Sequence, residues 1–313
     1  MASGLRPSDP SLLYAGTADD PRLGQRIKAG IPSRKGIALV GFADDRAIVN
    51  GRGRPGAALG PAEARRFLSR LTPGDGGELD GLAIGDLGDA ASSGSIEETH
   101  AVAEEAALEA LRAGACVVLL GGGHDGAFAS HSALLRAVPG RVGAVNVDAH
   151  LDVRPLRNGK ITSGTPFRRL AERWGDRYGL HEFGIQPQHN ARAHRLFCEE
   201  RGFLIVTLAQ ARERGIAPAF ERALAQDGEA LAVSLDLDSV EAASAPGVSA
   251  PCPDGFSAAD LVACARAAGT DPRVRVLDVM ELSPPLDVDG RTARLAAMAI
   301  WSFLAGYAAR GRT

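Results

Sequence analysis

Short apolar runs recur along the chain and predict strands. They cover residues 36–41, 115–120, 141–147, 202–207, 230–236 and 273–280. Runs of this length, rich in Val, Leu and Ala, are typical of strands that are buried on both faces of a sheet. Between them, apolar residues at helical spacing predict helices over residues 95–112, 125–137 and 295–309, and another near Pro61. Alternating strands and helices predict a three-layer α/β/α protein with a mostly parallel central sheet.

The N-terminal segment differs from the rest of the chain. Residues 1–34 are polar and rich in Pro, Gly and Asp, so we expect them to form an extended arm. No shift in composition divides residues 35–313, which predicts a single domain over that range. The arm lacks the pattern of a signal peptide, and the apolar run 295–309 is too short for a membrane span. We therefore expect a cytoplasmic protein without a membrane partner.

Composition and charge narrow the classes of function. The chain has 313 residues, 45% of them hydrophobic, so it can bury the large core of an enzyme domain. A net charge of -3 argues against nucleic acid as a partner. The spacing of the cysteines is not that of metal ligands, and we expect reduced thiols at Cys116, Cys198, Cys252 and Cys264.

The first candidate chemistry follows the apolar run 141–147. Asp148, His150 and Asp152 alternate along the chain, so successive members of an extended strand would lie about 6.6 Å apart. The outer two would then be too far apart for one compact site. We therefore expect the strand to stop near Asp148 and the backbone to curl, which would gather the three side chains around a cation. The alternative is a solvated loop.

Two other strand ends favour the metal site. Asp236 and Asp238 end the run near residue 236, and buried carboxylates are rarely left without a partner. Three glycines, 121–123, allow a sharp turn that presents His124 at the end of a third strand. The combined set of two imidazoles and four carboxylates is suited to a pair of divalent ions. Ligands without thiolate favour Mn(II), with Fe, Co, Ni and Zn left open.

These three blocks resemble the metal motifs of the ureohydrolase family, which includes arginase, agmatinase, guanidinobutyrase and formimidoylglutamase. The blocks are Gly-Gly-Gly-His ending at His124, Asp-Ala-His-Leu-Asp over 148–152 and Ser-Leu-Asp-Leu-Asp over 234–238. The likeness extends from about residue 35 to residue 309, and it implies an arginase-like catalytic domain that forms trimers or hexamers. It also implies two Mn2+ ions per subunit, one on His124, Asp148, Asp152 and Asp236, the other on Asp148, His150, Asp236 and Asp238.

The residues at two positions resemble those of formimidoylglutamases more than those of arginases. Arginases carry asparagine where this chain has Arg154, and arginases and agmatinases carry a catalytic histidine where it has Ser163. The resemblance implies that Arg154 binds a substrate carboxylate and that Ser163 and Gly164 line the substrate site. The histidine proton shuttle has no obvious replacement, because we expect His181, His189 and His194 to be surface or loop residues.

The implied reaction is hydrolysis of N-formimidoyl-L-glutamate to L-glutamate and formamide, a step of histidine degradation. A water activated by the two ions would attack the imino carbon. Asp152 would act as a general acid and base, and Glu281 would hold the cationic amidine nitrogen of the substrate.

Three alternatives remain open at this point. A guanidino ureohydrolase would release urea, although Arg154 and Ser163 argue against it. A zinc amide hydrolase of the deacetylase type would need only one ion, whereas six ligands favour two. A non-catalytic paralogue would be expected to lack a ligand, and none is missing.

Overall fold

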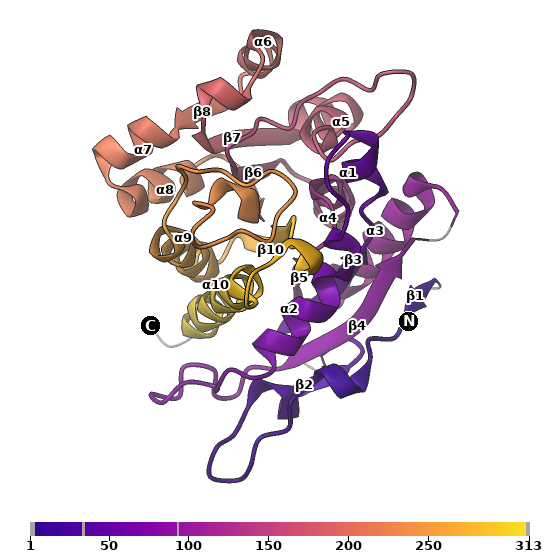
Figure 1. Cartoon of the computed structure of the whole chain (residues 1–313), viewed down its shortest axis with the longest axis vertical. Helices are drawn as coiled ribbons and strands as arrows, with labels where there is room; N and C mark the ends of the chain where they lie inside the picture. Colours follow the sequence, from indigo (N-terminus) through magenta and orange to yellow (C-terminus); the bar gives the residue numbers. More distant parts are fainter. Residues whose placement is uncertain (1–3, 33–34, 93, 311–313) are drawn as a thin grey trace.

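The predicted strands lie in one large sheet. The computed structural model describes residues 4–32, 35–92 and 94–310. Over these residues the sheet has ten strands (Figure 1). Their bounds are β1 Leu5–Arg6, β2 Ile27–Ala29, β3 Ile37–Ala43, β4 Ile84–Ala91, β5 Cys116–Leu120, β6 Val142–Val147, β7 Tyr178–Ile185, β8 Leu204–Thr207, β9 Ala230–Asp236 and β10 Val274–Met280.

The strand order places the last strands of the chain at the centre. It runs β1-β4-β3-β5-β10-β9-β6-β7-β8, with β2 also paired to β4, on the edge away from β3. All of these pairs are parallel except the pair of β1 with β4. The carboxyl ends of β5, β10, β9 and β6 therefore meet along one edge, where α/β sheets place their binding sites.

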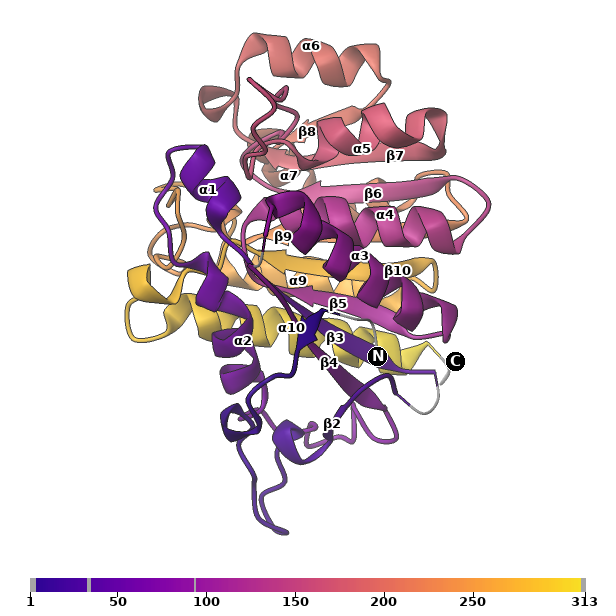
Figure 2. The ribbon, with the colours of Figure 1, turned by 90° about the vertical axis from the view of Figure 1, so that its right-hand side faces the viewer.

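Helices cover both faces of the sheet. Side chains alternate along β5: Val118 and Leu120 pack into one core with α2, α8, α9 and α10, whereas Val117 and Leu119 pack into the other with α3, α4 and α5. Figure 2 shows α3, α4 and α5 on the near side of the sheet. The three-layer α/β/α architecture is confirmed. The helices are α1 Arg46–Asn50, α2 Gly60–Leu68, α3 Ile96–Arg112, α4 Ala127–Ala137, α5 Pro166–Trp174, α6 Arg192–Glu200, α7 Leu208–Arg214, α8 Ile216–Leu224, α9 Ala258–Thr270 and α10 Arg291–Ala309.

Several boundaries differ from the sequence expectation. The strand expected over residues 202–207 is shorter at its start, and α10 begins at Arg291 rather than near residue 295. Arg291 and Arg294 lie on the exposed side of α10, so their polarity concealed its first turn. Residues 124–126 form a 3-10 turn before α4 begins.

Four strands were not predicted: the short β1 and β2 in the N-terminal arm, and β4 and β7, which polar residues interrupt. The β4 strand carries Asp86 and Asp89, which lie beside Arg65 of α2. The Arg65 guanidinium is fully buried, with Nε 2.7 Å from Asp86 and Nη1 2.6 Å from Asp89. This pairing allows charged residues on a strand that faces the core. The β7 strand similarly contains His181 and Glu182.

The described part of the N-terminal arm extends one edge of the sheet. Residues 5–6 pair with β4 in the antiparallel direction, and residues 27–29 pair with it in parallel. The division of the chain at residues 34 and 35 remains a prediction. Among the described residues no helix is long and apolar enough to cross a membrane, and the four cysteines are buried and unpaired.

Candidate metal centre

A glycine turn at the end of β5 positions His124. Gly121 and Gly122 have φ values of 65° and 74°, and a Cβ on Gly122 would lie 2.1 Å from the Phe42 carbonyl oxygen. Glycine is therefore required for this close approach. His124 is buried, and its Nε2 lies 2.9 Å from Ser234 Oγ on β9, which β10 separates from β5. This contact fixes the ring so that Nδ1 faces the carboxylates.

The backbone curls after β6, as the sequence predicts. The strand ends at Val147, and the amide of His150 then donates to Asp148 Oδ1 at 2.7 Å. Asp152 follows with a φ of 45°, a left-handed conformation that is unfavourable for a residue with a side chain. The turn points Asp152 back toward Asp148. Strained backbone of this kind is concentrated at functional sites.

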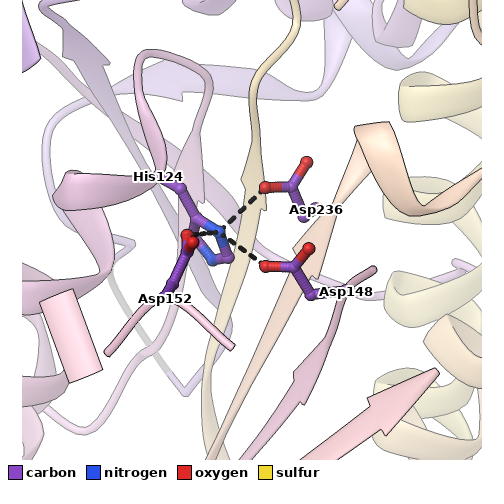
Figure 3. A group of neighbouring side chains, drawn as sticks. All are labelled: His124, Asp148, Asp152 and Asp236. Atoms are coloured by element: carbon purple, nitrogen blue, oxygen red, sulfur yellow. Dashed lines mark ion pairs between the residues drawn. The ribbon is translucent and has the colours of Figure 1, made fainter. Parts of the chain in front are cut away.

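Three carboxylates surround His124. Its Nδ1 lies 2.8 Å from Asp236 Oδ2, 3.1 Å from Asp152 Oδ2 and 3.3 Å from Asp148 Oδ2 (Figure 3). The four side chains come from the ends of β5, β6 and β9, and their ligand atoms lie within 4.8 Å of one another. We call them the inner ligand group. One nitrogen and three oxygens at this spacing can hold a divalent ion.

A second group adjoins the first and shares Asp148. His150 Nδ1 lies 3.3 Å from Asp148 Oδ1 and 3.3 Å from Asp238 Oδ1. We call these three residues the outer ligand group. Asp148 faces the two groups with its two different oxygens, which is the arrangement of a bridging carboxylate. Asp236 belongs to the inner group, and its other oxygen accepts the Asp238 amide at 2.8 Å. The bridging role of Asp236 remains a prediction.

The charges of the site are unbalanced without cations. Burial, with repulsion from Asp238 and Asp148, raises the pKa of Asp236 well above its usual value. Burial also raises the pKa of Asp238 to about 6, against the opposing effect of His150. Buried His124 Nδ1 and Asp238 Oδ1 have no hydrogen-bond partner in the part of the chain that is described. Bound cations would satisfy these atoms and stabilise the ionised carboxylates, so the donor set fits a pair of metal ions.

A buried polar layer behind the ligands was not recognised from the sequence. Asn146 Nδ2 donates to Asp148 at 3.3 Å and to Glu182 Oε2 at 2.9 Å. Glu182 is fully buried, and burial raises its pKa well above the usual value. Alternation along β6 places Asn146 on the side of Asp148, which was the available signal. Glu182 lies on a strand that was itself not predicted.

Glu281 lies beside the inner ligand group at the end of β10. Its Oε1 accepts a hydrogen bond from the His124 amide at 2.9 Å, and its φ is 68°. Burial and the nearby Asp236 raise the pKa of this carboxyl well above its usual value. Asp152 and Glu281, the two residues predicted to be catalytic, thus both have left-handed backbone and both line the cavity above the ligands.

The inner cavity, of about 320 Å3, opens above the metal ligands. Arg154, Ser163 and Gly164 line it, together with Ser249 of the loop over residues 245–251. The Arg154 amide donates to the Gly164 carbonyl at 2.8 Å, and its side chain lies directly over Gly164. A Cβ on Gly164 would come within 2.8 Å of Arg154 Cδ. The predicted substrate-binding residues are therefore brought together at one wall.

An outer cavity of about 620 Å3 adjoins the inner one and shares His150 and Asp152 with it. His189 and His194 line it, and the ring of His189 lies edge-on to His150 with 5.5 Å between centroids. His189 is an exposed residue, as predicted, whereas His181 on β7 and His194 on α6 are half-buried. The position of His189 depends on how the segment after β7 folds back, and no sequence pattern indicated it.

The model of the arginase family matches residues 35–306 of this chain. The chain belongs to the arginase family. This membership confirms the resemblance inferred from the three metal motifs, and it agrees with the sheet and helix layers described above.

The similar proteins reported next are all named formimidoylglutamase or formiminoglutamase. A formimidoylglutamase of Klebsiella pneumoniae subsp. pneumoniae is 36% identical over 273 residues, which cover 85% of this chain and 84% of that protein. A formimidoylglutamase of Ralstonia nicotianae is 35% identical, with 94% of each chain covered. The crystal structure of Trypanosoma cruzi formiminoglutamase with Mn2+ has a TM-score of 0.87 and 35% identity, and the match covers 93% of this chain and all of that one.

Proposed function

We propose that this protein is a manganese-dependent formimidoylglutamase. It hydrolyses the C–N bond of N-formimidoyl-L-glutamate and releases L-glutamate and formamide. The observation that carries the proposal is the position of Arg154, which lines the same cavity as both metal ligand groups. A guanidinium in that place suits a substrate that has both an amidine and a carboxylate. Relatives of similar length carry this activity in their names.

The two ligand groups are assigned to two Mn2+ ions. His124, Asp148, Asp152 and Asp236 would hold one, and Asp148, His150 and Asp238, together with Asp236, would hold the other. Nitrogen and carboxylate ligands without thiolate support this choice, as does the manganese in the Trypanosoma cruzi protein. When bound, two such ions make hydroxide available from water near neutral pH.

The residues of the chain then have separate tasks. Asp152 accepts a proton from the attacking water and passes it to the leaving nitrogen, a role supported by its place at the cavity floor. The Glu281 carboxylate holds the cationic amidine nitrogen through a charge-assisted hydrogen bond. Arg154 binds a carboxylate of the substrate, and Ser163 and Gly164 shape the wall beside it.

Ser163 favours an amidine substrate over a guanidino compound. The position of Ser163 matches that of a catalytic histidine in arginases and agmatinases. A serine hydroxyl cannot replace an imidazole as a proton shuttle near neutral pH. Release of formamide rather than urea is therefore the proposed outcome.

The proposal extends to the cellular setting and the assembly. We assign the protein to the cytoplasm and to histidine degradation, and we expect a homo-oligomer, either a trimer or a hexamer. An exposed apolar patch supports association: Met298 of α10 is half exposed beside Trp301 and Leu71. Light scattering on the purified protein tests the oligomeric state.

A substrate panel tests the activity. The Mn-loaded protein is assayed with formimidoylglutamate, arginine, agmatine and guanidinobutyrate, and formamide, ammonia and urea are measured separately. We expect formamide from formimidoylglutamate and no urea from the other three. Urea from a guanidino compound would overturn the assignment of the substrate while leaving the metal site in place.

A further inference from the structure

Two arginines lie where the inner and outer cavities join. Arg52 and Arg154 each line both cavities, together with His150 and Asp152. They come from different loops: Arg52 follows α1, at the left edge of the sheet in Figure 2, whereas Arg154 follows the metal ligands of β6. A substrate bound in the inner cavity therefore has two guanidinium groups beside it.

The other basic side chains near the cavities either bind elsewhere or line only one cavity. The Arg54 guanidinium donates to the carbonyls of Ser249 and Val248 at 3.0 and 2.7 Å, so it holds a loop. Arg157 and Lys160 line only the outer cavity. Within the described ranges, the guanidinium groups of Arg52 and Arg154 have no hydrogen-bonding or ion-pair partner. Two unpaired guanidinium groups beside a site create a positive potential that attracts anionic ligands.

The backbone of Arg52 supports a functional role. Its φ is 65°, in the left-handed region, where glycine and asparagine are accepted much more easily than arginine. The residue follows Gly51 and precedes Gly53, and its amide donates to the Val49 carbonyl at 2.9 Å as the α1 helix ends. An exposed arginine that adopts this conformation gains nothing from packing. A strained residue beside a site is a candidate for recognition.

We infer that Arg52 and Arg154 each bind one of the two carboxylates of the substrate. This inference rests on the proposed function, because formimidoylglutamate carries two carboxylates, one beside the amidine and one at the end of its side chain. A planar guanidinium can bind each of them through two hydrogen bonds. The pair of arginines selects dicarboxylates over substrates that have a single anionic group.

Truncated substrates combined with variants test the assignment. The substrates are N-formimidoyl-L-glutamate, N-formimidoyl-L-glutamine and N-formimidoyl-4-aminobutyrate, which keep both carboxylates, only the first or only the second. Arg52→Asn and Arg154→Gln are compared with the unaltered enzyme and with Arg222→Gln, an equal charge change on exposed α8 away from the cavities. All proteins are loaded with Mn2+, and kcat/KM is measured for formamide release.

Arg52→Asn is expected to lower kcat/KM for formimidoylglutamate about 10- to 100-fold. The loss should shrink to about threefold or less on one truncated substrate, and that of Arg154→Gln should shrink on the other. An equal loss on all three substrates, or cancellation of both losses on the same one, would overturn the inference. Failure of the unaltered enzyme to act on formimidoylglutamate would instead contradict the proposed function, before any variant is compared.

Thermal unfolding separates recognition from a structural role. Asn accepts the left-handed conformation, so Arg52→Asn should unfold at a Tm equal to or above that of the unaltered protein. Calorimetric titration with L-glutamate should show the matching loss of affinity. A lowered Tm with unchanged glutamate binding would make Arg52 structural and overturn the inference.

Discussion

The floor and the rim of the cavity are built in different ways. The floor, made of the six predicted metal ligands, comes from the ends of β5, β6 and β9, and most of it is fully buried. The rim, made of Arg52, Arg154, Ser163 and Gly164, comes from loops and is exposed at both arginines. Ligands that must hold a fixed geometry are thus placed on the rigid sheet. The residues that we propose to select the substrate lie on segments that can vary without disturbing the sheet.

Removal of the metal is expected to have the largest effect on activity. It alters only the floor, because the metal ligands are there. Chelation should abolish activity, and Mn2+ should restore it. Binding to the folded state alone stabilises it by about 4 kcal/mol at an ion concentration of about 1,000 times Kd, so the Tm of the metal-free protein should be lower. Metal analysis should give two ions per chain. One ion per chain, or activity that survives chelation, would contradict the two-ion floor.

Asp148→Asn should come next, because Asp148 is the ligand that both groups share. An amide has no charge to offset two cations, so metal affinity should fall at both positions. The loss of several kcal/mol of transition-state stabilisation corresponds to about a thousandfold in kcat/KM. Asp238→Asn is the matched comparison, since it alters the outer group alone. Equal metal content in Asp148→Asn and the unaltered enzyme would refute the bridging role.

Arg154→Ala changes the rim without touching the floor. We expect KM to rise about 10- to 100-fold, since a hydrogen-bonded charge is worth about 1.5 to 3 kcal/mol. The two metal ions should be retained. Steady-state kinetics and metal analysis on the same sample check both statements, and an unchanged KM would remove Arg154 from substrate binding.

Ser234→Ala removes a polar partner of His124, a predicted metal ligand of the floor. Ser234 Oγ lies 2.9 Å from Nε2 of His124, the nitrogen on the far side of the ring from the carboxylates. Loss of such a partner lowers metal affinity about 10-fold or somewhat more. Competition with a chelator measures it, and Ser239→Ala is a control on a serine that binds a backbone carbonyl instead. KM at saturating Mn2+ should not change.

Gly164→Ala should give the smallest effect. The added Cβ would lie 2.8 Å from Arg154 Cδ and 2.9 Å from Nε, so the flexible side chain must move. Because Gly164 does not have a positive φ, alanine fits its backbone. We expect KM to rise about threefold, as part of the Arg154 interaction is lost. An effect as large as that of Arg154→Ala would mean that Gly164 also contacts the substrate.

The same division explains what the sequence could predict. Apolar runs and the residues just beyond them are close in sequence, so the metal ligands at the ends of β5, β6 and β9 could be identified. The β4 and β7 strands could not be predicted, because Asp86, Asp89 and Glu182 are accommodated there by polar partners that are distant in sequence. Family resemblance was needed to single out Arg154 and Ser163.

The rim was harder to predict because loops from distant parts of the chain form it. Arg52 and His189 reach the cavity through turns whose direction depends on contacts such as Asn50 Nδ2 to the Ile161 carbonyl, at 2.9 Å. Neither residue lies in an apolar or periodic pattern. Their neighbours in space are set by tertiary packing, which local sequence does not specify.

The strand order has a consequence for synthesis of the protein on the ribosome. The β9 and β10 strands are made last but lie between β5 and β6, which are made much earlier. A growing chain therefore has a gap at the middle of its sheet, and neither metal group is complete until Asp236 and Asp238 have emerged. Long-range strand pairing of this kind is slow, and the edges of β5 and β6 stay exposed until β9 and β10 pair with them. A chain truncated before residue 236 therefore lacks ligands of both groups and cannot hold the ions as a pair.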